Sequence, residues 1–186
     1  MSYISANDLQ KYSNVYSDII LQQEYIDAAE NIVNNYLGYS PTLHAYNNIL
    51  NGRGTHELQL RAKPIQDIVH LSIDGTSIPI NEFYFTNDSE FLYYNNFFPD
   101  GTKNIQIEYT AGWGSVIDDD TVNGNSLPKI IKLTVLRIAS LLQTESDSNI
   151  GITSKSFADS GTRTFINNTD YYKYLIPISL YRILVI

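Results

Sequence analysis

Apolar residues near the start of the chain recur at the spacing of an amphipathic helix. Ser17 or Asp18 is placed to cap this helix, and Gly38 stands where a left-handed C-terminal cap belongs. A shorter helical turn is expected before it, over residues 5–12. Within residues 18–38 the apolar stripe consists of Tyr25, Ala29, Ile32 and Tyr36, widened by Ile26 and Val33.

Farther along the chain, apolar residues recur at every second position, which is the spacing of a β-strand. Residues 39–55 are rich in Pro, Asn and Gly and predict a connecting loop. Residues 57–113 alternate apolar and polar side chains, and the dipeptides Asp74-Gly75 and Asp100-Gly101 favour tight turns, so a compact antiparallel β-subdomain is expected there. Further short strands are expected at residues 83–85 and 91–94. The alternating apolar positions are Leu58, Leu60, Val69, Leu71, Ile73, Ile105, Ile107 and Tyr109.

Helical spacing returns in the last third of the chain. Residues 127–144 predict a helix with Pro128 in its first turn, where proline is tolerated. Residues 145–168 are rich in Ser, Asn and Gly and too long for a routine connection, which predicts an extended arm. Residues 169–186 are expected to form a last helical segment that Pro177 should kink or restart. The buried face of the helix at 127–144 is marked by Ile131, Val135, Ile138 and Leu142.

These elements predict an α+β fold: a small helical bundle with an inserted antiparallel β-subdomain and a long extended arm before the C-terminal helix. The 186 residues fit one domain, so residues 1–186 are expected to form a single unit. A hydrophobic fraction of 43% with 17% charged residues is typical of a globular protein. No apolar run is long enough for a membrane span, and the first ten residues show no signal peptide.

The charge of the chain disfavours tight binding to nucleic acid. A net charge of −8 argues against gripping the outside of a duplex, although an acidic wall suits a conduit past which DNA slides. Up to Leu127 there are 5 basic and 16 acidic residues, whereas from Pro128 onward there are 7 basic and 4 acidic residues. This asymmetry would let copies or a partner dock by complementarity. It is equally consistent with two differently solvated faces of one domain.

Residues that support catalysis do not converge in the sequence. His44, His56 and His70 fall in the expected loop, at a strand edge and within a strand, without metal-ligand spacing. There is no cysteine, and therefore no disulfide or thiolate site. The run Asp118-Asp119-Asp120 hints at a calcium loop, but a ligand position is wrongly occupied in either register, which favours a solvated acidic loop. We expect no active site, metal or cofactor.

Aromatic residues are concentrated in the β-subdomain. Platforms that stack bases are paired with basic residues, whereas Lys103 is the only nearby cation. Core or subunit-interface packing is therefore the preferred interpretation, and carbohydrate or receptor binding by a monomer remains an alternative. The cluster consists of Phe83, Tyr84, Phe85, Phe91, Tyr93, Tyr94, Phe97 and Phe98.

Several blocks of the sequence, taken in order, carry a family resemblance. The strongest is Tyr109-Thr110-Ala111-Gly112-Trp113, followed after a polar loop by Leu127-Pro128 and a helix. With the strand pair from Leu58 to Gly75, the helix end at Tyr36-Leu37-Gly38-Tyr39 and Leu180-Tyr181-Arg182, the chain resembles head–tail connector (portal adaptor) proteins of tailed double-stranded DNA phages over about residues 18–182. Where the family pattern runs directly into Leu-Pro, this chain inserts Gly114 to Ser126.

The resemblance implies a structural, non-enzymatic virion protein without cofactor. It implies a ring of about a dozen copies that joins portal to tail and extends the DNA channel. The implied partners are sister copies, the portal protein, a tail or stopper protein, and genomic double-stranded DNA that passes without sequence-specific binding; no membrane is implied. The implied location is the portal vertex or neck of a virion assembled in the host cytoplasm. A tail-completion or stopper ring is the alternative within the virion.

Two sets of residues are candidates for this role. The arm is hypothesised to reach the portal or a neighbouring copy, because Thr162, Thr164 and Ile166 alternate with Arg163, Phe165 and Asn167 as in a strand that adds to a sheet. A flexible surface loop is the alternative. Trp113, the only tryptophan, is expected to anchor the β-subdomain against the helices. Candidate interface residues are Phe83, Tyr84, Tyr93, Tyr94, Arg163, Phe165, Tyr181 and Arg182, and candidate structural anchors are Tyr109, Gly112, Trp113 and Pro128.

Overall fold

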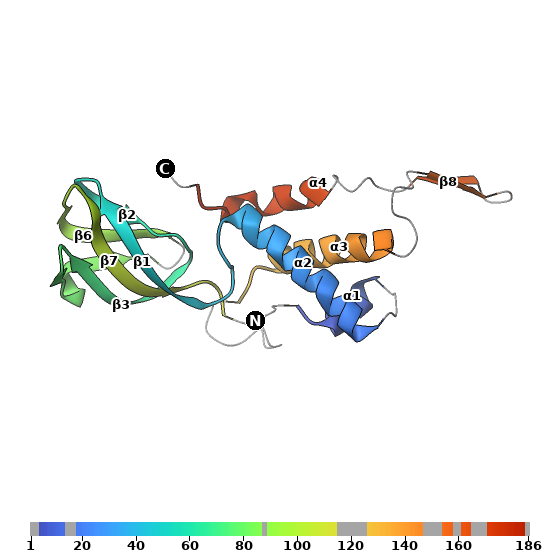
Figure 1. Ribbon diagram of the computed structural model, residues 1–186, viewed down its shortest axis with the longest axis horizontal. Coiled ribbons are helices and arrows are strands. Elements are labelled where there is room, and N and C mark those ends of the chain that lie inside the picture. The colour runs from blue at the N-terminus through green and yellow to red at the C-terminus, as the bar shows by residue number, and fades with distance from the viewer. Residues whose placement is uncertain are drawn as a thin grey trace. The chain divides into compact units, whose positions relative to one another are not determined.

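The computed structural model combines helices with antiparallel sheets, which confirms the α+β class (Figure 1). It describes residues 4–13, 18–86, 89–114, 126–146, 154–157, 161–164 and 171–184. The chain divides into two compact units. A helical unit comprises Met1–Tyr36 and Pro128–Arg182, and a β unit comprises Leu37–Leu127 and Ile183–Ile186.

The helical unit is built around α3 (Lys129–Ser146), which packs against α1 (Ala6–Ser13) and against the C-terminal segment. That segment is a single α-helical turn, α4 (Tyr172–Leu175), continued by the 3-10 helix η3 (Ile176–Tyr181). The change of helix type beside Pro177 confirms the predicted restart, since proline cannot donate the next helical hydrogen bond. The buried apolar side chains of the unit include Leu9, Ile26, Ala29, Val33, Ile131, Val135, Ile138, Ala139, Leu175 and Ile178.

Helix α2 (Ile19–Leu37) begins and ends where its sequence predicts. The Asp18 carboxylate accepts a hydrogen bond from the Ile20 N–H at 2.9 Å, and Gly38 takes a left-handed φ of 87°. The centre of its buried stripe differs from the prediction. Its fully buried apolar positions are Ile26, Ala29, Val33 and Leu37, whereas Tyr25, Ile32 and Tyr36 are half-buried at the margins.

Pro128 immediately precedes α3, and its carbonyl accepts the N–H groups of Ile131 and Lys132 at 2.9 and 3.3 Å. Proline suits this place because an N–H here would have no helical partner. Three of the four predicted core positions, Ile131, Val135 and Ile138, are fully buried. The fourth, Leu142, is half-buried.

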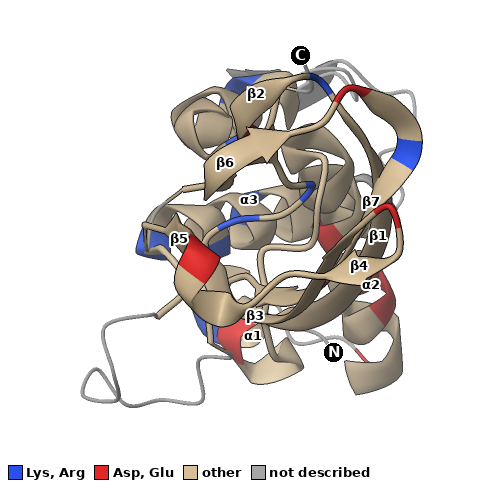
Figure 2. Cartoon of the chain, turned by 90° about the vertical axis from the view of Figure 1, so that its left-hand side faces the viewer, with Lys and Arg blue, Asp and Glu red and all other residues tan. Residues whose placement is uncertain are grey.

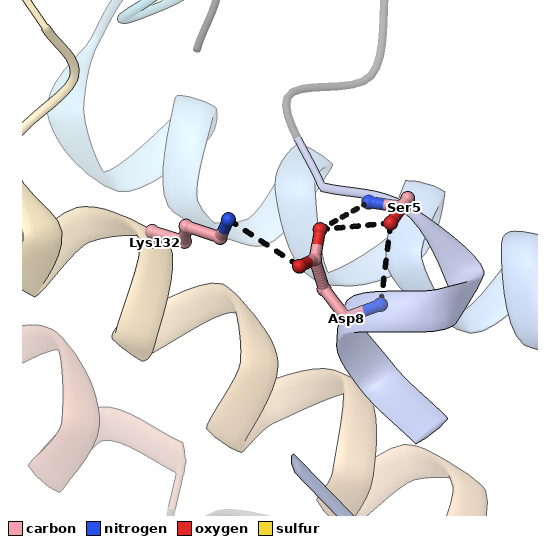
Figure 3. A network of polar contacts seen from close by, with 3 residues as sticks. All are labelled: Ser5, Asp8 and Lys132. Atoms are coloured by element: carbon pink, nitrogen blue, oxygen red, sulfur yellow. Dashed lines mark hydrogen bonds and ion pairs between the residues drawn. The ribbon is translucent and has the colours of Figure 1, made fainter. Parts of the chain in front are cut away.

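A capping network holds α1 and joins it to α3 (Figure 3). The Ser5 N–H and hydroxyl donate to Asp8 Oδ2 at 3.1 and 2.8 Å, and the Asp8 N–H donates back to Ser5 Oγ at 3.2 Å. Lys132 Nζ lies 3.5 Å from Asp8 Oδ1. Partial burial alone would raise the pKa of Asp8, but the Ser5 hydrogen bonds and the Lys132 charge outweigh it and lower the pKa.

The described part of the predicted arm contains a β-hairpin. Strands β8 (Ser154–Phe157) and β9 (Gly161–Thr164) pair antiparallel, with Lys155 opposite Arg163. Thr162 and Thr164 thus lie in a strand, as their alternation suggested, with β8 as the partner. Phe165 and the remaining arm positions lie outside the described residues.

The β unit contains two antiparallel sheets. One has the order β1-β7-β3-β4, from His44–Gly52, Gly101–Ala111, Ile65–Ile73 and Thr76–Ser77. The other has the order β2-β6-β5, from Thr55–Gln59, Phe91–Phe98 and Phe83–Phe85, with a short 3-10 turn η1 (Ile80–Glu82) before β5. The turn between β3 and β4 is Asp74-Gly75, with φ of 49° and 79°, which confirms the predicted hairpin.

The expectation of a loop throughout residues 39–55 is wrong. Residues 44–52 form β1, which pairs with β7 from His44 opposite Ala111 to Gly52 opposite Gly101. Asparagine has low strand propensity, so this Asn-rich segment gives little strand signal of its own. Backbone pairing with β7 stabilises the strand in place of intrinsic propensity. Asn side chains also stabilise it, since Asn47 Nδ2 donates to Glu108 Oε1 at 3.1 Å.

The predicted alternation in β7 is confirmed by its burial. Ile105, Ile107, Tyr109 and Ala111 are each 0 or 1% exposed, whereas Gln106 between them is exposed. The second sheet contributes Leu58, Phe83, Leu92, Tyr94 and Phe98 to the buried set of the unit.

Candidate assembly surfaces

Tyr109 ties the two sheets together in the β unit. Its ring is 1% exposed and stacks on Tyr46 of β1, with centroids 5.2 Å apart. Its hydroxyl donates to Asn48 Oδ1 at 3.0 Å and accepts the N–H of Arg61, just after β2, at 3.2 Å. Burial raises the pKa of Tyr109 to about 12. The residue therefore acts as an internal tie.

Gly112 lies where three segments of the chain meet. Its φ is 107°, and a Cβ there would stand 2.3 Å from the carbonyl oxygen of Thr42. The Gly112 N–H donates to the Pro64 carbonyl at 2.9 Å. Neighbouring Trp113 is half-buried and exchanges backbone hydrogen bonds with Pro41 and Leu43. Only glycine fits this close approach without strain, and the role of Trp113 as an anchor against the helices stays a prediction.

The aromatic candidates of the second sheet separate into two faces. Phe83 and Tyr94 are each 9% exposed and point into the β unit. Tyr84 and Tyr93, opposite each other in the β5–β6 register, lie on the outer face, and their rings stack with centroids 5.2 Å apart. Tyr84 is 57% exposed. Of the four, Tyr84 and Tyr93 are thus the two whose side chains reach the surface of the β unit.

The C-terminal candidates belong mostly to the helical unit. The Arg182 guanidinium lies 5.3 Å from the centre of the Tyr36 ring, and Tyr181 is half-buried. The backbone of Arg163 lies in β9, and Phe165 lies outside the described residues. Three apolar side chains of α4 and η3 are largely exposed, namely Tyr172, Ile176 and Leu180.

A groove of about 460 Å³ runs between β1 and β2, the outer strands of the two sheets. Ile49 and Phe91 form part of its apolar lining, and Arg53, Arg61 and Lys103 bring three cations to it. Sequence reasoning missed this groove, because β1 was interpreted as a loop. Figure 2 shows how sparse the charged positions are along the strands of the chain.

The described histidines His44 and His56 lie beside backbone carbonyls. His44 Nδ1 lies 2.8 Å from the Thr42 carbonyl, and His56 Nδ1 lies 2.9 Å from that of Asn96 while its ring contacts Phe97. Across the described residues, no three His, Asp or Glu side chains are grouped to hold a metal ion. Among the described helices, none has the length and hydropathy to cross a membrane.

Known proteins resemble this chain in both sequence and fold. The sequence profile of a family described as head completion protein matches residues 4–127. No curated protein matches the sequence. Among solved structures, a chain from "Neck of empty GTA particle computed with C6 symmetry" superposes with a TM-score of 0.61 at 11% identity, covering 99% of this chain and 91% of that chain.

Two further structures give similar values. A chain from "Virion of native gene transfer agent (GTA) particle" has a TM-score of 0.60 at 10% identity, covering 99% of this chain and 91% of that chain. A chain from "Neck of native GTA particle computed with C12 symmetry" has a TM-score of 0.60 at 13% identity, covering 97% of this chain and 89% of that chain. At these identities the similarity establishes a shared fold.

Proposed function

We propose, because this chain belongs to the head completion protein family, that it forms a ring adaptor between the portal vertex and the tail in the neck of a virion. Membership agrees with the family resemblance in the sequence. It makes the chain a structural virion protein rather than an enzyme.

The observation that carries the proposal is the extent of the fold similarity. It covers 97–99% of this chain and 89–91% of the matched chains from the GTA particles. Two of those structures are necks of GTA particles that were computed with C6 or C12 symmetry. A ring of about a dozen copies is the corresponding proposal for this chain.

The charge and the exposed residues fit such a ring. Head-to-tail contacts in a ring join two different surfaces of each copy, so a subunit needs two complementary patches. The stacked pair of exposed Tyr84 and half-buried Tyr93, and the exposed apolar residues of the C-terminal segment, are available for such contacts. A net charge of −8 disfavours adhesion to phosphates and so suits a passage through which DNA moves.

The test is attachment to the portal. The purified full chain is mixed with the portal of the same phage and viewed by electron microscopy, with the copy number measured from the mass of the complex. A ring of about a dozen copies on the portal is expected. A chain that ignores the portal but binds the tail end would instead be a tail-completion or stopper protein. A chain that binds neither, and recognises glycans as a monomer, would overturn the proposal.

A further inference from the structure

The groove between β1 and β2 concentrates positive charge in an acidic part of the chain. Residues 37–127 contain four basic and eleven acidic residues. Three of those four cations, Arg53, Arg61 and Lys103, line this one groove, beside a single carboxylate from Glu57. The fourth, Lys63, forms an ion pair with Glu90 at 3.4 Å. Such concentration indicates a site for an acidic partner.

The backbone N–H groups of two of these cations are held by side chains from other segments of the chain. The Arg61 N–H is held by the hydroxyl of Tyr109 at 3.2 Å. The Lys103 N–H, near the start of β7, donates to Asn51 Oδ1 at 2.7 Å, and Lys103 has a φ of 55°. The backbone that carries these two cations is therefore held in place before binding, which reduces the entropy lost on binding.

The apolar lining adds a second requirement for the ligand. Ile49 is 57% exposed on β1, and Phe91 is half-buried at the start of β6. Among the described strands, β1 pairs only with β7, so an extended segment would also find backbone groups along its outer edge. The ligand that fits is an extended peptide with apolar residues next to several carboxylates.

One segment of this chain has that chemistry. Residues 116–120 read Val-Ile-Asp-Asp-Asp and contain the only adjacent acidic residues in the sequence. They lie within the insertion that departs from the family pattern, and outside the described residues. Because a ring requires two different complementary surfaces on each copy, a basic groove and an acidic segment form a suitable pair.

We infer that the groove between β1 and β2 is the docking site for residues 116–120 of a neighbouring copy. The apolar pair Val-Ile contacts Ile49 and Phe91, and the three carboxylates face Arg53, Arg61 and Lys103. This inference rests on the proposed ring and specifies one of its subunit contacts. No covalent step is involved.

The main experiment reverses the charges on each side of the contact. One full-length variant carries Arg61→Glu and Lys103→Glu, and another carries Asp118→Lys and Asp119→Lys. Either variant by itself should form rings on the portal about tenfold less well than the wild type. An equimolar mixture of the two variants should restore ring formation, because the reversed groove of one variant then meets the reversed segment of the other. The matched control, Lys11→Glu with Lys129→Glu, makes the same change of charge at two exposed positions outside the groove and should assemble normally.

The other outcomes overturn the inference. Normal assembly by both reversed variants would mean that the contact is unused. Rescue only when all four changes are in one chain would place the segment in its own groove. If the groove variant assembled normally but lost affinity for duplex DNA, the cations would bind DNA phosphates and not the acidic segment. Failure of every combination, with folding intact by circular dichroism, would also exclude the contact.

A second measurement separates this inference from the proposed function. A labelled peptide of residues 114–122 is titrated with the full chain carrying Asp118→Asn, Asp119→Asn and Asp120→Asn, and its binding is followed by fluorescence anisotropy. Salt should weaken binding. Ile49→Ser should weaken it several-fold, whereas Val69→Ser, at a position 65% exposed and outside the groove, should not. Binding that ignored Ile49 and the cations would contradict the inference even if the portal ring formed.

Discussion

Tyr109 shows how one side chain can join two sheets. Its hydroxyl satisfies Asn48 and the Arg61 N–H, so Tyr109→Phe leaves both groups without this partner. We expect the variant to lose about 1–2 kcal/mol of unfolding free energy at neutral pH, measured by urea denaturation. The control Tyr84→Phe removes a hydroxyl from a ring that is 57% exposed and should change stability by less than about 0.5 kcal/mol.

The same residue makes stability depend on alkaline pH. Burial raises the pKa of Tyr109 from 10.0 to about 12, so the folded state keeps a proton that the unfolded state loses first. The stability that the neutral phenol contributes is present below pH 10 and is lost as the pH rises towards 12. Tyr109→Phe should therefore lose less stability than the wild type over that interval. An equal loss in both proteins would contradict this assignment.

At the scale of elements, the success of sequence reasoning followed the strength of each local pattern. Helices α2 and α3 were predicted because their apolar positions repeat over five turns. Strand β1 was missed because half of it faces solvent and its Asn residues carry no strand preference. Those residues nonetheless support the strand, for example through Asn51, which binds the Lys103 N–H.

The aromatic candidates could be located from the sequence, but the face of the sheet on which each side chain lies could not. The composition of residues 83–98 identified the cluster, but only the β5–β6 register shows that Tyr84 and Tyr93 face outward while Phe83 and Tyr94 face inward. The groove was beyond sequence reasoning for a similar reason. Its cations are far apart in sequence, and β1 had to be recognised as a strand before they could be seen to converge.

Helix α1 depends on its surroundings, because eight residues are too few for a stable isolated helix. Ser5→Ala removes the side-chain cap and should cost about 1 kcal/mol of unfolding free energy in urea denaturation. Ser77→Ala, at an exposed position of β4, is the control and should change little. A null result for Ser5→Ala would mean that the buried Leu9 side chain alone holds the helix.

Asp8 adds an acid dependence to the same helix. Partial burial alone would raise the pKa of Asp8, but the Ser5 hydrogen bonds and Lys132 hold this pKa below its usual value of 3.8. The contribution of Asp8 is therefore present above that value and is lost as the pH falls through the lowered pKa. The effect is small because the ion pair is partly exposed. Asp8→Asn should remove this part of the acid dependence in pH-resolved urea denaturation.

At the scale of the whole molecule, the chain has two sets of buried side chains. The helical unit buries the set that includes Ile26, Val135 and Ile178, and the β unit buries the set around Ile107 and Tyr109. Almost all α-helix belongs to the first unit, and Trp113, the only tryptophan, belongs to the second. Helix circular dichroism and tryptophan fluorescence therefore report on different units during unfolding.

Gly112→Ala tests whether the two units unfold separately. The new Cβ would stand 2.3 Å from the Thr42 carbonyl at a φ of 107°, so the β unit should lose on the order of 3 kcal/mol. Gly75→Ala is the matched control: its φ is 79° but nothing lies within 4 Å, so only about 1 kcal/mol of backbone strain is expected. For Gly112→Ala, the fluorescence transition in urea should move to lower denaturant while the helix signal stays near its wild-type midpoint. If both signals moved together, the two units would instead unfold as one cooperative body, and the variant would destabilise the entire subunit.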